Sequence, residues 1–422
     1  MSDPIQVFEY GTLPVGGPLT PARFDCLVRY NERHGNKYFD VGHKRIHFRN
    51  YVGVIQVGSL TIEILPKADR MPESPSQKDK WQRALVDMLQ QAGYIRMSTL
   101  SDARLRLRSS TLLDIYFETF LAEVQGLVHR GLVRKYRPVR SNLPALKGRL
   151  LFTQQISRNI AHRERFFTEH VFYDRNNRYN QILRMALKVL VEVSANPHLK
   201  ALARSLLISF EGVDEIAVSE HTFTRLPRTR NTESYRRALD IARLILLDQS
   251  PDVRGGRESV LAILFDMNQL FERFVYAQLK RAEARQPSRA VTFKAQVSHR
   301  FWEAERMRTS VRPDIVAEQD RGSGPERIIL DTKWKLPSDG RPSDSDLQQM
   351  HCYNLQFGAL KSLLLYPRVS EKCDDVLGDF VQAQAPHGVT KHSCGIVFLE
   401  LFVGDKLRRN MGDELIAKLA SA

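Results

Sequence analysis

The spacing of apolar and polar residues predicts a mixed α/β chain whose last third is the most regular part. Residues 311–318 and 327–336 are β-rich runs on either side of a Gly-, Asp- and Pro-containing turn, which predicts a β-hairpin. Upstream, apolar residues recur at helical spacing over 258–282, which predicts an amphipathic helix. The elements expected after the hairpin are a helix capped at 343–346 and strands at 361–366 and 395–401.

The same patterns divide the chain into three regions. Residues 1–95 are predicted to form a β-rich N-terminal domain. Residues 96–250 are expected to be mainly helical and basic, with helices at 112–129, 178–194 and 232–247. A Ser-Pro to Gly-Gly stretch after residue 249 predicts a linker into a C-terminal domain of residues 251–422.

The predicted hairpin places two acids opposite each other. Directly opposed residues of an antiparallel pair have numbers that average to the centre of the turn. Asp314 and Asp331 average to about 322.5, inside the glycine-bearing loop, so they are expected to face each other. Two carboxylates about 5 Å apart at Cβ repel each other unless a cation lies between them. The hairpin therefore predicts a divalent metal site.

Strand alternation adds a lysine to the same face. Asp331, Lys333 and Lys335 are expected on one face with Ile329, whereas Ile328, Leu330, Thr332, Trp334 and Leu336 are expected on the other. Lys333 would orient an attacking water or offset charge on a phosphate. Carboxylate oxygens with open positions suit Mg²⁺, or alternatively Mn²⁺, so the expected reaction is phosphodiester hydrolysis.

Flanking helices contribute three further candidates. Glu272 lies near the polar edge of the predicted helix over 258–282, where it is either an ordinary surface acid or a group close to the metal. Gln349 and Tyr353 are four residues apart in the next predicted helix and are expected to share a face.

These residues resemble the PD-(D/E)xK restriction-endonuclease-like nucleases and, within them, the McrC subunits of McrBC-type modification-dependent restriction systems. The specific resemblance extends through segments 52–58, 60–67, 142–150, 267–272, 331–335 and 346–350. It implies that Asp314 and Asp331 bind the metal, that the Thr332 carbonyl adds a ligand and that Lys333 is the catalytic lysine. Glu272 resembles the helical acid of such nucleases, and Gln349 with Tyr353 resembles the Gln-xxx-Tyr motif of the RecB-like branch.

The resemblance also implies a partner, an McrB-like AAA+ GTPase that forms a hexameric ring and recognises modified double-stranded DNA. The N-terminal region would dock on that ring. The sequence contains no G-x-x-x-x-G-K-[S/T] motif, so we expect the motor to reside in another chain. Two alternatives are a RecB-like repair or recombination nuclease and a non-catalytic DNA-binding adaptor that stimulates the partner.

Charge supports a polyanionic partner. The formal net charge is +15, and residues 96–165 hold 14 Lys or Arg against 5 Asp or Glu. Either DNA or a partner protein could use this basic surface; the predicted DNA contacts are Arg104, Arg106, Arg108, Arg134, Lys135, Arg137, Lys147, Arg149 and Lys335. The sequence has no signal-peptide pattern, no apolar run of membrane-spanning length and only four scattered cysteines, so a cytoplasmic location is expected.

Overall fold

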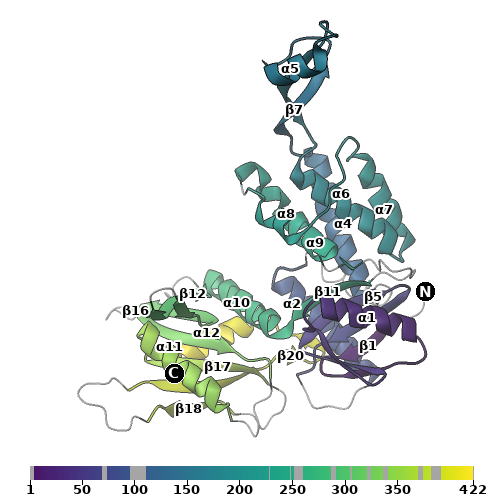
Figure 1. Cartoon of the computed structure of the whole chain (residues 1–422). Helices are drawn as coiled ribbons and strands as arrows, with labels where there is room; N and C mark the ends of the chain where they lie inside the picture. Colours follow the sequence, from purple (N-terminus) through teal and green to yellow (C-terminus); the bar gives the residue numbers. More distant parts are fainter. Residues whose placement is uncertain are drawn as a thin grey trace.

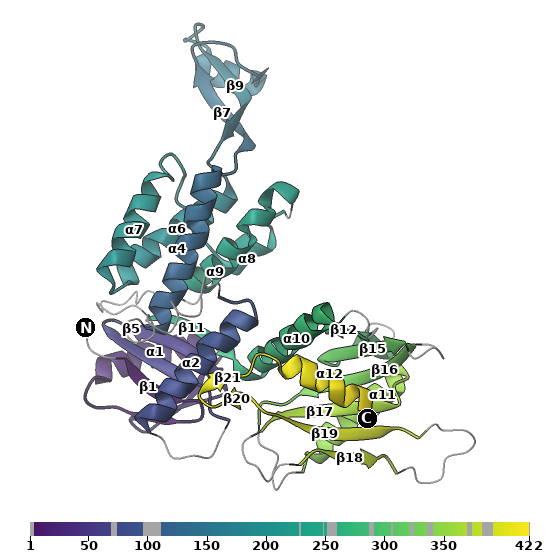
Figure 2. The same cartoon turned by 180° about the vertical axis from the view of Figure 1, so that it is seen from behind.

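The computed structural model describes residues 4–68, 74–95, 111–227, 229–247, 249–250, 260–286, 291–304, 307–320, 325–335, 341–368, 374–381 and 391–421. It confirms a mixed α/β fold. Figures 1 and 2 show two sheet-containing parts lying side by side, with a helical part above the first of them. No described helix has the length and apolar character needed to cross a membrane.

The first part is built on a five-stranded sheet in the order β1-β6-β5-β11-β10. Its strands are β1 (Ile5–Phe8), β5 (Tyr51–Val57), β6 (Leu60–Leu65), β10 (Gln249–Ser250) and β11 (Val260–Asp266). Helix α1 (Pro21–Arg33) packs on one face and α2 (Pro75–Gln91) on the other, and a small sheet is formed by β2 (Thr12–Pro14), β3 (Phe39–Gly42) and β4 (Arg45–Phe48). We call this part, β10 and β11 included, the N-terminal domain.

Strand β11 corrects the sequence prediction of one helix over 258–282. Residues Val260–Asp266 are a strand that pairs with β5, and the helix α10 (Met267–Arg285) begins only after it. Asp266 caps α10 by accepting hydrogen bonds from the backbone N–H of Asn268 and Gln269. Residues beyond the predicted linker therefore complete the N-terminal sheet.

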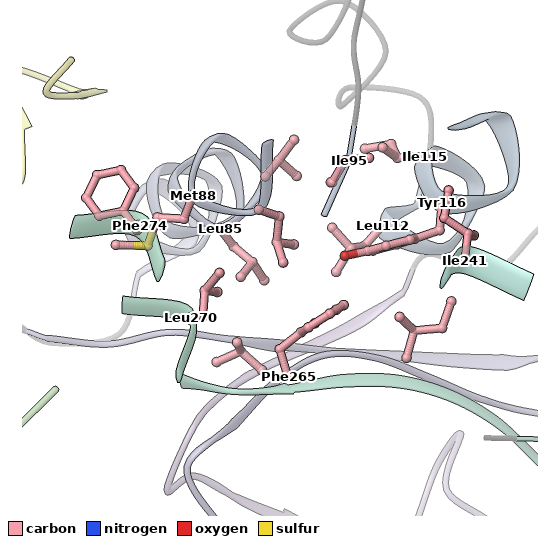
Figure 3. Packing of buried hydrophobic residues seen from close by; sticks show 14 of the residues in the cluster. Leu85, Met88, Ile95, Leu112, Ile115, Tyr116, Ile241, Phe265, Leu270 and Phe274 are labelled. Carbon is pink, nitrogen blue, oxygen red and sulfur yellow. The ribbon is translucent and has the colours of Figure 1, made fainter. Parts of the chain in front are cut away.

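The helical part contains α4 (Leu112–Arg130), α6 (Arg178–Val193), α7 (Pro197–Ile208), α8 (Glu220–Thr224), η1 (Arg230–Tyr235) and α9 (Arg236–Leu247). The three predicted helices are confirmed within a few residues. Figure 3 shows side chains of α2, α4, α9, α10 and β11 meeting in one apolar cluster, including Leu85, Tyr116, Ile241, Phe265 and Phe274. The helices are therefore packed onto the N-terminal sheet.

A projection that the sequence did not predict rises from the helical part. It consists of β7 (Lys135–Leu143), β8 (Arg149–Leu150), α5 (Phe152–Asn159) and β9 (Phe166–Asp174), with the strands in the order β7-β9-β8. Figure 1 shows it extending away from both sheet-containing parts. We call residues 134–174 the finger.

The C-terminal part is a six-stranded mixed sheet in the order β12-β15-β16-β17-β19-β18. Its strands are β12 (Val291–Ala295), β15 (Ile315–Asp320), β16 (Pro325–Thr332), β17 (Lys361–Pro367), β18 (Val376–Asp379) and β19 (Ser393–Leu399). Helix α11 (Asp344–Phe357) covers one face, and α10 with α12 (Met411–Ser421) lies on the other. Two hairpins, β13 (His299–Ala304) with β14 (Met307–Val311) and β20 (Phe402–Val403) with β21 (Lys406–Leu407), complete it.

Candidate active site

The predicted register of the central hairpin is confirmed. Strands β15 and β16 are antiparallel, and Ile315 pairs with Leu330. Asp314 directly precedes Ile315, the paired residue at this end of β15, and its charge acts on Asp331. The backbone N–H and the hydroxyl of Thr332 both donate to Asp314 Oδ2 at 2.8 Å, which fixes that carboxylate beside the end of β16.

The two faces of β16 separate as strand alternation predicts. Ile329 belongs to the apolar cluster under α11, whereas Ile328 and Leu330 belong to the cluster on the α10 side. Trp334, two residues beyond the end of β16, joins the same α10-side cluster, and Leu336 lies outside the described residues. Both faces are buried, so the expected division into one packing face and one working face is too simple. The acidic and basic groups lie where the α11 face reaches the end of the strand.

Asp331 is a buried carboxylate with few partners. Its exposed fraction is 3%, and its Oδ2 lies 2.8 Å from Lys333 Nζ while accepting no other hydrogen bond in the described part of the chain. Burial, followed by the nearby charge of Asp314, raises the pKa of Asp331 to about 6 despite the opposing effect of Lys333. The site thus concentrates more negative charge than its own lysine neutralises.

Glu272 reaches the same centre from α10. Gln296 Nε2 donates a hydrogen bond to Glu272 Oε1. Burial raises the pKa of Glu272 to about 7, with the charge of Asp314 as the next cause and Asp331 also contributing. Glu272 therefore lies near enough to Asp314 and Asp331 for their charges to act on it.

Lys333 is held by contacts on three sides. Its backbone N–H donates to the Leu365 carbonyl at 2.9 Å, and its Nζ donates to Gln349 Oε1 at 3.0 Å. Nζ also lies 3.3 Å from Asp346 Oδ1. Burial alone would lower the pKa of Lys333, but the charges of Asp331 and Asp346 outweigh it and raise the pKa. The side chain therefore remains an ammonium donor.

Gln349 and Tyr353 share a face of α11, as predicted. Gln349 Nε2 donates to the Tyr353 hydroxyl at 2.7 Å, and that hydroxyl donates to the Arg312 carbonyl at 3.2 Å. A relay of hydrogen bonds thus joins Lys333 to the segment just before Asp314. Beside it opens a cleft of about 500 Å³ lined by Ser298, Ser310, Val311, Arg312, Gln349, Cys352 and Tyr353.

Asp346 is a site residue that the sequence pattern predicts only as part of the helix cap at 343–346. It is 5% exposed, and its Oδ2 lies 2.6 Å from Lys335 Nζ and accepts from Ser343 Oγ at 2.7 Å. Burial alone would raise its pKa, but the hydrogen bonds from Lys335 and Ser343 and the charge of Lys333 lower it to about 2. Lys335, predicted to contact DNA, is thus already paired within the site.

The donor set fits a hard divalent cation. Asp331 Oδ2 is a buried oxygen without a hydrogen-bond partner other than the neighbouring ammonium, and nearby carboxylate charge contributes to raising the pKa of both Asp331 and Glu272. Among the described residues, no group of three or more His, Cys, Asp or Glu side chains is placed to hold a metal ion, so a cation here would depend on two carboxylates and on non-carboxylate oxygens. An ion held by Asp314, Asp331 and the Thr332 carbonyl would therefore keep positions for water or substrate.

The remaining basic candidates do not join this site. Arg104, Arg106 and Arg108 lie outside the described residues. Arg134, Lys135, Arg137, Lys147 and Arg149 belong to the finger, which Figure 1 shows at the far end of the molecule from α11 and β16. Arg137 forms an ion pair with Asp174 at 2.9 Å, and Lys147 Nζ lies 4.4 Å from the centroid of the Phe172 ring.

A family model described as McrBC 5-methylcytosine restriction system component matches residues 46–367. The chain belongs to this family. It is 23% identical over 178 residues to the Type IV methyl-directed restriction enzyme EcoKMcrBC of Escherichia coli (strain K12). That alignment covers 41% of this chain and 51% of the relative, so the chain spans about half the length of the curated relative it matches.

Two solved structures show the shared fold. One is a refined half-complex from a tetradecameric assembly of Thermococcus gammatolerans McrB AAA+ hexamers with bound McrC. A chain of it matches with a TM-score of 0.68 at 20% identity, covering 99% of this chain and 100% of its own length. The other is a cryo-EM structure of the Thermococcus gammatolerans McrBC complex. It matches with a TM-score of 0.50 at 23% identity, and the match covers 66% of this chain and 88% of the matching chain. The expected McrC-type family and fold are therefore confirmed.

Proposed function

We propose that this McrBC-family chain is the Mg²⁺-dependent endonuclease subunit of a restriction complex, cutting double-stranded DNA when engaged by an McrB-like AAA+ GTPase hexamer. The observation that carries the proposal is a buried Asp331 that feels the charge of Asp314, the residue just before β15, and has the Lys333 ammonium 2.8 Å away. Family membership and the AAA+ assemblies of the matching structures support the partner.

The residues divide the chemistry among them. Asp314, Asp331 and the Thr332 carbonyl would hold the Mg²⁺, which would supply Lewis-acid polarisation of the scissile phosphate and activation of a water. Lys333 donates hydrogen bonds to the attacking water or to a phosphate oxygen as negative charge develops. Glu272, with a pKa raised to about 7 by burial and by Asp314, accepts a proton near neutral pH. Gln349 and Tyr353 hold the lysine in place.

The test combines the purified chain, its AAA+ partner, GTP, Mg²⁺ and methylated or unmodified plasmid. We expect Asp331→Asn to assemble on DNA and support GTP hydrolysis at wild-type rates but not to cleave. Glu318→Gln is the matched control, because Glu318 is a carboxylate of the same hairpin that pairs with Lys294 and Arg327.

Each outcome separates one alternative. Undiminished cleavage by Asp331→Asn would refute the catalytic assignment. If the wild-type chain stimulates GTP hydrolysis but never cuts, the chain is an adaptor. Cleavage of DNA ends without the AAA+ partner and GTP would instead favour a RecB-like repair nuclease.

A further inference from the structure

Trp334 connects the candidate active site to the N-terminal domain. It directly follows Lys333, is 5% exposed and lies in the apolar cluster on the α10 side. Its ring centroid is 5.1 Å from that of Phe271 on α10 and 6.2 Å from that of Trp81 on α2, which it meets at 90°. Trp334 is the chain neighbour of Lys333, so fixing this indole also restricts the backbone from which the lysine side chain extends.

The indole N–H is bound by an acid from the other end of the chain. Trp334 Nε1 donates to Glu9 Oε1 at 2.7 Å, a contact between residues 325 apart in sequence. Glu9 follows β1, its backbone N–H donates to the Leu65 carbonyl, and its Oε1 also accepts from the Lys67 backbone at 2.9 Å. The acceptor is therefore fixed to the N-terminal sheet.

The Glu9 carboxylate is buried at a cost in folding free energy. It is 4% exposed, and its Oε2 has no hydrogen-bond partner in the described part of the chain. Burial raises its pKa to about 7, although the hydrogen bonds from Lys67 and Trp334 oppose the shift. Burying a carboxylate with an unmatched oxygen destabilises a fold, so packing alone does not account for this acid.

A second connection runs parallel to the first. Asn50 of the N-terminal domain donates to the Asp266 cap of α10 at 3.0 Å, and its carbonyl accepts from the Met267 backbone. Helix α10 then carries Phe271 into the aromatic cluster and Glu272 into the candidate site. Lys333 is followed by Trp334, and Glu272 is preceded by Phe271. The rings of Trp334 and Phe271 pack against each other.

We propose that Glu9 is a positioning residue for the candidate active site: its carboxylate fixes the Trp334 indole to the N-terminal domain and thereby sets the Lys333 ammonium beside Asp331. The inference rests on the proposed nuclease function. DNA cleavage would then depend on the hydrogen bond that Trp334 donates to Glu9. Glu9 belongs to the N-terminal domain, which is expected to dock on the AAA+ ring.

The kinetic test uses the full chain with its partner, GTP and Mg²⁺. Trp334→Phe keeps an aromatic side chain, although a smaller one, and removes the donor, whereas Glu9→Leu removes the acceptor. We expect each to lower kcat for plasmid cleavage roughly 10-fold with DNA affinity and GTP hydrolysis unchanged, and the double variant to lose no more than either single one. Glu9→Gln retains an acceptor oxygen and is expected to restore most of kcat.

Glu63→Gln is the matched control. Glu63 is a fully buried carboxylate of the same sheet, and it accepts hydrogen bonds from Gln6 on β1, Gln82 on α2 and the Leu112 backbone of α4. It should lower the melting temperature, because Glu63 accepts three hydrogen bonds, yet leave kcat within about twofold of wild type. Equal losses of kcat in Glu63→Gln and Glu9→Leu would overturn the inference.

A spectroscopic readout separates the inference from the proposed function. In ¹⁵N-tryptophan-labelled protein, the Trp334 indole resonance, assigned by its absence in Trp334→Phe, should shift with pH around 7 as Glu9 ionises and stop titrating in Glu9→Gln. An indole signal that ignores pH and Glu9→Gln refutes the link itself. Wild-type kcat in Glu9→Leu, with Asp331→Asn inactive, overturns the positioning role and leaves the nuclease assignment intact. Cleavage by Asp331→Asn refutes the nuclease assignment instead.

Discussion

The candidate active site and the finger use charge in opposite ways. In the site, the side chains of Asp331, Lys333 and Asp346 are 4%, 18% and 8% exposed and contact one another. In the finger, Arg140 is 62% exposed in its ion pair with Glu169, and apolar rings such as Tyr136 are open to solvent as well. One region buries a connected set of charges, and the other displays separate ones.

The difference decides how each region responds to substitution. Removing one member of a buried pair leaves its partner uncompensated in a medium of low dielectric constant, so the site should fail as a unit. Exposed pairs are screened by water and salt and contribute little individually, so finger substitutions should have small and additive effects. Four measurements test this contrast.

The largest effect is expected for Lys333→Met, which keeps most of the side-chain volume and removes the ammonium. Cleavage should fall roughly 10²- to 10³-fold at saturating DNA, because the developing charge on the phosphate loses its donor. Lys294→Met is the control, since Lys294 pairs with Glu318 on the same sheet and is largely exposed. Comparable losses in both variants would remove the distinction between Lys333 and an ordinary strand lysine.

Asp346→Asn is expected to follow, with a roughly 30-fold decrease in kcat. It takes the counter-charge from both Lys333 and Lys335 while leaving the Ser343 cap of α11 in place. Asp344→Asn, an exposed acid in the same helical turn, should be near wild type in cleavage and in melting temperature. If the two variants behave alike, Asp346 acts only through helix stability.

The hairpin could be predicted from sequence because its geometry is local. A turn of known position and the alternation of side chains suffice to predict the register of the hairpin, in which the charge of Asp314 acts on Asp331, and to separate the two faces of β16. Asp346 could not be placed in the same way. Its distance from Lys333 depends on how α11 folds back over the sheet between the parallel strands β16 and β17, which no local pattern fixes.

Two fold elements were missed for different physical reasons. Strand β11 lies between β5 and β10 and is apolar on both faces, so its short run merges with the helical pattern of α10. The Asp266 cap was the available signal for the boundary. In the finger, β7 alternates between exposed and partly exposed residues, and without a buried face its sequence carries little hydrophobic pattern.

The pH dependence of stability gives the third measurement. A carboxyl whose pKa is raised on folding contributes stability below its unfolded value, and that contribution is lost as pH rises through the folded value. Burial and Asp314 raise the pKa of Asp331 to about 6, so metal-free wild type should lose stability relative to Asp331→Asn between pH 4 and 7. We expect a relative change of about 1–3 kcal/mol in urea titrations, and rescue of wild type alone by Mg²⁺ at pH 8. If the difference in unfolding free energy between wild type and Asp331→Asn does not change with pH, the pKa of Asp331 is not raised by burial.

The smallest effect is expected in the finger, from Arg149→Gln. If this exposed arginine contacts a DNA phosphate, its loss should weaken DNA binding a few-fold and reduce the slope of log affinity against log salt by about 0.9, with kcat at saturating DNA unchanged. Arg163→Gln provides an exposed finger arginine outside the predicted contact set. An unchanged salt slope in Arg149→Gln, with weakened assembly on the AAA+ partner, would assign the basic finger to protein docking. An exposed charge contributes little on its own. If Arg149→Gln lowers kcat as much as Lys333→Met does, the finger and the active site do not differ in their response to charge removal.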